Sequence, residues 1–122
     1  MTTTMPRKPT CSRGDVVLVL FPHSDLRTAK TRPAVIVQAN DLDTGMSQVI
    51  VAMISSRMFR AGHPSRVVIS LRSTSGQASG LLGDSVVMAD NVATVTMAAI
   101  DRVIGSVPMA DIDVALRHTF AL

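Results

Sequence analysis

The side chains best suited to chemistry in this sequence are arginines, and one of them stands directly before a proline. Arg32 precedes Pro33 at the start of the apolar run Ala34–Gln38. Pro33 suits the first residue of a strand, and it biases Arg32 towards an extended backbone that aims the side chain out of the sheet end. A guanidinium is always charged and meets phosphate oxygens in bidentate fashion. Arg32 is therefore a candidate group for stabilising a phosphate.

The charge is unevenly distributed along the chain. Ten of the 12 basic residues lie within residues 1–72, which hold four of the nine acidic ones, so this part carries +6 and the remainder −3. The basic residues concentrate in two segments, 27–32 and 57–66. If these loops lie side by side, they form a cationic groove suited to phosphates. The alternative is that they are solvated surface arginines, and the charges alone leave both interpretations open.

Three apolar blocks stand in a characteristic order. The first comprises Arg13–Pro22 and Lys30–Val37, the second is Val49–Ser56 with two terminal hydroxyls, and the third runs through Gly80–Asp90 to Ile104–Val107. Together they resemble the PemK/MazF family, the mRNA-cleaving toxins of type II toxin–antitoxin pairs. A single block is unspecific, whereas three blocks in order are much more specific.

The resemblance implies a set of catalytic residues. It places the family's catalytic arginine at Arg32 and a phosphate-binding hydroxyl at Ser55, where the family usually has threonine. Asp90 matches an acidic position that one branch uses as the base, although Met88 replaces the arginine of that branch. His23 is displaced by three residues from a histidine of some members, and it is a candidate acid or base because it titrates near neutrality. Structurally, Ser55 and Asp90 could equally belong to turns.

RNA binding is expected from the same loops. Single-strand binders commonly stack bases on aromatic side chains, and the chain has only three phenylalanines and no Tyr or Trp. Phe59 lies among the basic residues of the second loop, whereas Phe120 is expected in the core. The residues expected to bind RNA are Arg27, Lys30, Arg57, Phe59 and Arg60.

The function implied is a metal-independent endoribonuclease toxin that cleaves single-stranded mRNA and needs no cofactor. A small acidic antitoxin would neutralise it, and it would form a homodimer through its first strand, third strand and C-terminal helix. One alternative is a non-enzymatic toxin of the same fold that poisons gyrase, against which the absence of tryptophan counts. Another is a degenerate member that only binds RNA or antitoxin.

The expected fold is mainly β: a small SH3-like antiparallel barrel with a short helical turn over Met97–Ile100, capped by Thr96, and a C-terminal helix over Met109–Leu122. Residues 1–12 are expected to form a flexible tail and residues 13–122 one domain. The continuous apolar run Val16–Phe21 indicates a strand buried on both faces. Short Val/Ile-rich runs predict the strands, which are Asp15–Phe21, Ala34–Gln38, Gln48–Ile54, Arg66–Ser70, Ser85–Asp90 and Arg102–Val107.

The remaining composition favours a cytoplasmic protein. No apolar run approaches the ~20 residues of a membrane helix. The single cysteine, Cys11, cannot form an intrachain disulfide, which suits a reducing compartment. Three scattered histidines and one cysteine show no zinc-ligand spacing, so no metal site is expected.

Overall fold

A computed structural model describes residues 10–22 and 29–122, and the chain is mainly β as predicted. The strands are β1 (Asp15–Pro22), β2 (Ala29–Ile36), β3 (Gln48–Ser55), β4 (Arg66–Ile69), β5 (Ser85–Thr96) and β6 (Ile100–Ser106). The helices are α1 (Thr74–Ala78) and α2 (Ala110–Phe120), with the 3-10 turns η1 (Met58–Arg60) and η2 (Met97–Ala99). The sequence predicted neither α1 nor η1.

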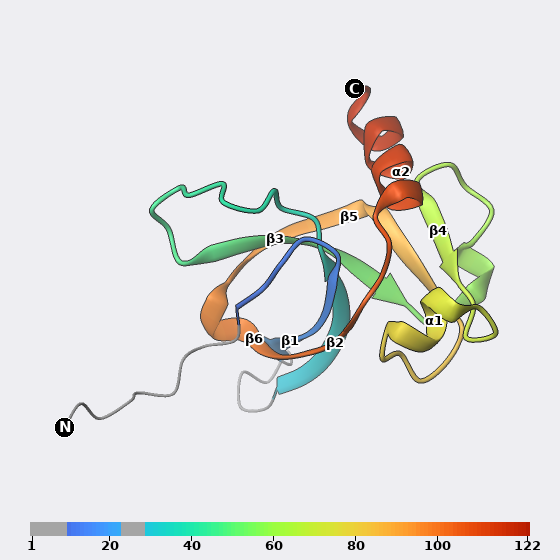
Figure 1. The fold of residues 1–122 in the computed structure, drawn as a ribbon, viewed down its shortest axis with the longest axis horizontal. Coiled ribbons are helices and arrows are strands. Elements are labelled where there is room, and N and C mark those ends of the chain that lie inside the picture. Colours follow the sequence, from blue (N-terminus) through green and yellow to red (C-terminus); the bar gives the residue numbers. More distant parts are fainter. Residues whose placement is uncertain (1–9, 23–28) are drawn as a thin grey trace.

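The six strands form one antiparallel sheet in the order β4-β5-β3-β2-β1-β6. Figure 1 shows the sheet strongly curled, with α1 and α2 near the β4 end. Among the described residues no ladder joins the edge strands β4 and β6. The predicted curled antiparallel sheet is therefore present, but it is open rather than closed into a barrel.

Strand β5 is twice as long as predicted and contains an irregularity. Met53 of β3 pairs with Met88, whereas the preceding Ala52 pairs with Val92, so residues 89–91 of β5 have no partner on β3. Such an insertion bends a strand and increases its twist. The bend lets the first half of β5 pair with both β3 and β4 while the second half follows β3 alone.

Pro33 does not begin its strand, contrary to the sequence prediction. Strand β2 starts at Ala29, and Pro33 lies opposite Leu18 of β1. The ladder with β3 starts only at Ala34, so the first part of β2 pairs with β1 alone. A proline is tolerated there because that part of β2 is an edge.

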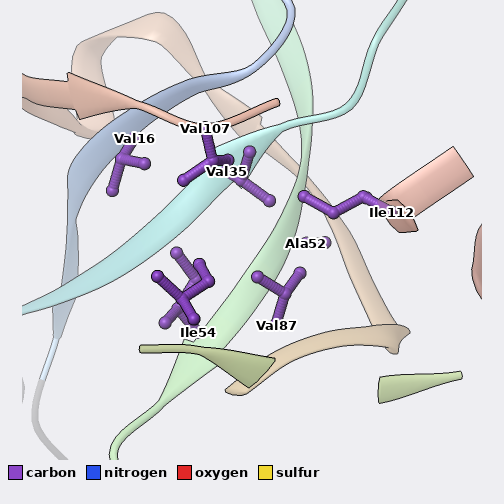
Figure 2. Close-up of a cluster of buried hydrophobic side chains, with 8 residues drawn as sticks. Val16, Val35, Ala52, Ile54, Val87, Val107 and Ile112 are labelled. Atoms are coloured by element: carbon purple, nitrogen blue, oxygen red, sulfur yellow. The ribbon is translucent and has the colours of Figure 1, made fainter. Parts of the chain in front are cut away.

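The central parts of β1, β2 and β3 are buried on both faces, as the run Val16–Phe21 predicted for the first strand, although Leu20 near the end of that run is 37% exposed. Alternating residues enter two separate clusters: Val16 belongs to the one that α2 covers with Ile112, and Val17 to the other with Ile100. Figure 2 shows the first cluster, in which Ile112 reaches Ala52 and Val35 from the helix. These two cores fix the positions of β1, β2 and β3, which carry part of the candidate site.

Helix α2 falls within the predicted range, and its buried residues are Ile112 and Ala115. Phe120, predicted to lie in the core, is 54% exposed. Figure 1 shows the C-terminal end of α2 extending past the sheet, so the last turn has no core to face. The helical turn predicted after Thr96 is present as η2, but the Thr96 side chain makes no capping hydrogen bond. Within the described residues, neither helix is long and apolar enough to span a bilayer.

Candidate functional site

A pocket of about 900 Å³ opens at the start of β2 and the end of β3, and residues of β5 between Ser85 and Ala93 line it as well. Its lining includes four of the basic side chains singled out above, and no acidic side chain lines it among the described residues. Met53 and Met88 contribute to its apolar lining. The cations that line it are Lys30, Arg32, Arg57 and Arg60. An uncompensated positive pocket of this kind attracts anions.

Arg32 and Ser55 come together because of the strand register. Ala34 pairs with Met53 at the end of the β2–β3 ladder, so Arg32 stands two residues before this pair on β2 and Ser55 two residues after it on β3. Both line the pocket. The Arg32 side chain is exposed, whereas Ser55 is half-buried at the end of β3. The structure therefore places the predicted guanidinium and hydroxyl at one site.

The turn η1 and its N-cap bring two of the predicted RNA-binding residues, Arg57 and Arg60, to the pocket lining. The backbone N–H of Arg57 donates to Ser55 Oγ at 3.1 Å, which ties the turn to the end of β3. Arg60 places its Nη1 3.5 Å from Met88 Sδ, so its guanidinium covers the methionine that replaces the arginine of one family branch. Phe59 is 79% exposed beside the pocket lining, and the Arg60 guanidinium lies 5.9 Å from its ring centroid.

The opposite rim consists of the loop after α1. Gly80 has φ +73°, and a Cβ there would collide with the carbonyl of Ile104 on β6. Gly105 likewise approaches the backbone of Ala78 and Ser79. Only glycine permits these two approaches, and they hold the loop against β6. Leu82, which lines the pocket from this loop, is fully exposed.

Asp90 does not line the pocket. Its carboxylate accepts two hydrogen bonds from Arg66, from Nε to Oδ1 at 2.9 Å and from Nη2 to Oδ2 at 2.7 Å. This bidentate contact lowers the pKa of Asp90 below its usual range and raises that of Arg66. The sequence gives no sign that Arg66 pairs with Asp90, because the two residues are 24 positions apart.

Two predicted residues, His23 and Arg27, lie outside the described residues. The other two histidines contact each other: the rings of His63 and His118 pack edge to face with centroids 5.9 Å apart. His63 Nδ1 also lies 2.7 Å from Ser65 Oγ. In the part of the chain that the structure covers, no three His, Cys, Asp or Glu side chains cluster as a metal site requires.

Comparison with known families accounts for this arrangement. The family described as "PemK-like, MazF-like toxin of type II toxin-antitoxin system" matches residues 12–119, nearly the whole chain. The chain belongs to the PemK/MazF toxin family. The match confirms the resemblance carried by the three apolar blocks. No curated protein matches this PemK/MazF chain in a sequence comparison.

Solved structures share the fold. A mycobacterial endoribonuclease in complex with its cognate antitoxin superposes with a TM-score of 0.70 at 23% identity, covering 93% of this chain and 97% of that one. Mycobacterium tuberculosis toxin MazF-mt6 superposes with a TM-score of 0.67 at 22% identity, covering 88% of this chain and 97% of that one. A MazE–MazF structure from Deinococcus radiodurans superposes with a TM-score of 0.67 at 16% identity, covering 95% of this chain and 96% of that one. At these identities the likeness establishes the fold of the PemK/MazF chain.

Proposed function

We propose that this toxin is a metal-independent endoribonuclease that cleaves single-stranded mRNA. The observation that carries the proposal is the pocket in which four cations and the Ser55 hydroxyl converge while no acidic side chain lines it among the described residues. Such a pocket binds a phosphodiester and stabilises the negative charge that grows on it.

The cleavage step needs no group beyond the RNA itself to attack. The 2′-OH attacks the adjacent phosphorus, the bond to the 5′-oxygen breaks, and a proton leaves the nucleophile while another reaches the leaving oxygen. Arg32 would stabilise the phosphorane oxygens with its planar guanidinium. Ser55 Oγ accepts from Arg57 N–H, so its own hydroxyl hydrogen is available to donate to the phosphate. The sequence suggests His23 and Asp90 as the groups that transfer these protons.

The RNA chain would be held by the rest of the basic surface. Lys30, Arg57 and Arg60 line the pocket and would contact neighbouring phosphates, with Arg27 assigned the same role from the sequence. The exposed ring of Phe59, backed by the Arg60 guanidinium, offers a face on which a base can stack.

A cognate antitoxin is the proposed protein partner. The mycobacterial endoribonuclease and the Deinococcus radiodurans MazF were both solved with antitoxins. A short acidic segment that folds on binding would complement the positive pocket of this chain and cover Arg32. We also propose that the toxin acts in the cytoplasm, where its proposed mRNA substrate is found, and that it forms a homodimer.

The test is cleavage of one long RNA in EDTA by purified toxin. We expect Arg32→Ala to lower the rate by about 10²–10³-fold or more, because a preorganised donor to the transition state is lost. Arg32→Lys should rescue little, since an ammonium cannot reproduce the planar fork.

Arg72→Ala removes an exposed arginine that does not line the pocket, and it should cut at the wild-type rate. Circular dichroism must show each variant folded. A folded Arg32→Ala protein with wild-type activity would refute the site, and a wild type that binds RNA without cutting it would identify a binding-only member.

A further inference from the structure

Arg66 connects two parts of the site that are distant in sequence. Its Nε and Nη2 donate to the two oxygens of Asp90 on the irregular part of β5. Its Nη1 donates to the backbone carbonyl of Arg60 at 2.9 Å. One guanidinium therefore joins β5 to the last residue of η1, through an ion pair that lies outside the pocket lining.

The turn η1 has little else to hold it. It is three residues long, none of its side chains is buried, and Arg57 at its N-terminal cap makes no side-chain capping bond. A single turn of helix is not stable by itself in water. Its other fixed points are the Arg57 N–H bond to Ser55 Oγ and the long contact of Arg60 with Met88 Sδ. The hydrogen bond from Arg66 is the anchor at its C-terminal end.

Asp90 is poorly arranged to act as a base. Both carboxylate oxygens already accept hydrogen bonds, and the Arg66 contact lowers the pKa of Asp90, so its affinity for a proton is reduced. An efficient general base has a pKa near the working pH and lies within reach of the proton it removes. Asp90 has a lowered pKa and stands outside the pocket lining.

We propose that Asp90 and Arg66 are positioning residues, which hold η1 so that Arg57, Phe59 and Arg60 face the RNA. Asp90 orients the Arg66 guanidinium, and Arg66 in turn fixes the Arg60 carbonyl. This inference rests on the proposed function and replaces the catalytic role that the sequence suggested for Asp90. It predicts that losing the ion pair weakens RNA binding and spares the chemical step.

The experiment compares Asp90→Asn, Asp90→Glu and wild type on a single-site oligoribonucleotide and on its non-cleavable 2′-deoxy analogue. For Asp90→Asn we expect KM and the Kd of the analogue to rise about tenfold, as the loss of one charge-assisted hydrogen bond predicts, with kcat within about twofold. Asp90→Glu should recover part of the affinity. If Asp90 is the base, kcat falls by about 10²-fold or more, Kd is unchanged and the acid limb of the pH profile disappears, which would overturn the proposal.

Asp101→Asn is the matched control, because Asp101 also faces an arginine, Arg102 at 3.8 Å, but does not line the pocket. It should leave KM and kcat unchanged. Hydrogen exchange at the Arg60 and Ala61 amides, which close the turn, gives a readout that requires no activity. Faster exchange there in Asp90→Asn supports the anchor even if no RNA is cut, and unchanged exchange refutes it. Failure of the wild type to cleave would refute only the proposed function.

Discussion

At the scale of single residues, Ser55 would link binding and chemistry in the proposed mechanism. Its Oγ accepts from the Arg57 amide at 3.1 Å and lies in the same pocket as Arg32. The hydroxyl is what both tasks use, so the methyl group that a threonine would add is dispensable for them. This explains how serine can stand where the resemblance leads one to expect threonine.

We predict that Ser55→Ala slows single-turnover RNA cleavage by about tenfold, less than Arg32→Ala, because one neutral hydrogen bond to the phosphate is lost. Ser55→Thr should keep the wild-type rate, since the hydroxyl remains. Ser75→Ala, which removes an exposed hydroxyl from α1 outside the pocket, is the control. Equal rates for Ser55→Ala and wild type would remove Ser55 from the mechanism.

At the scale of elements, α2 is fastened to the sheet by more than its apolar face. Arg13, just before β1, pairs with Asp113 of α2 at 2.5 Å and donates through Nε to the Val37 carbonyl at 3.1 Å. The hydrogen bond from Arg13 lowers the pKa of Asp113. This ion pair stands at the junction of α2 with the start of β1 and the end of β2.

Because the folded-state pKa of Asp113 lies below its ordinary value of about 3.9, the contact stabilises the protein above that pH and is lost as the pH falls through the folded-state pKa. Asp113→Asn should therefore cost up to about 1 kcal/mol at pH 7, the range of a partly exposed ion pair. The difference from wild type should shrink towards pH 2. Urea unfolding at both pH values measures it, with Asp111→Asn on the same helix as the control. An equal cost at both pH values would contradict this.

At the scale of the whole molecule, we expect the proposed homodimer to use α2. The sequence pointed to the first strand, the third strand and the C-terminal helix. Strands β1 and β3 have hydrogen-bonded neighbours on both sides, and valines such as Val17 and Val51 are fully buried within the chain, so neither strand offers a free edge to a partner. On α2 and at the C-terminus, by contrast, Val114 is 62% and Leu122 87% exposed. Exposed apolar residues of this kind are typical of interaction surfaces.

We predict that sedimentation of the purified toxin shows a dimer at micromolar concentration, and that Val114→Glu shifts it to monomer because a carboxylate would be buried at the interface. Leu42→Glu, at an exposed leucine far from α2 in sequence, should leave the dimer intact. A wild type that sediments as a monomer without antitoxin would refute the homodimer.

The sequence by itself determined the class of the fold and the centre of the candidate site. Apolar runs such as Val16–Phe21 require two buried faces wherever they lie, so the mainly β architecture followed from local patterns. Arg32 and Ser55 were found through motif resemblance, and the pairing of β2 with β3 brings both into the lining of one pocket.

Only the tertiary structure decided which side chain Asp90 pairs with. The insertion at residues 89–91 shifts β5 against β3, and the ladder with β4 sets Arg66 opposite Met88, two residues before Asp90. No local pattern predicts that ion pair, nor the contact of Arg60 with Met88 or of His63 with His118. Such partners, from 24 to 55 positions apart, meet because strand pairing and helix docking bring them together, and these depend on the packing of the whole chain.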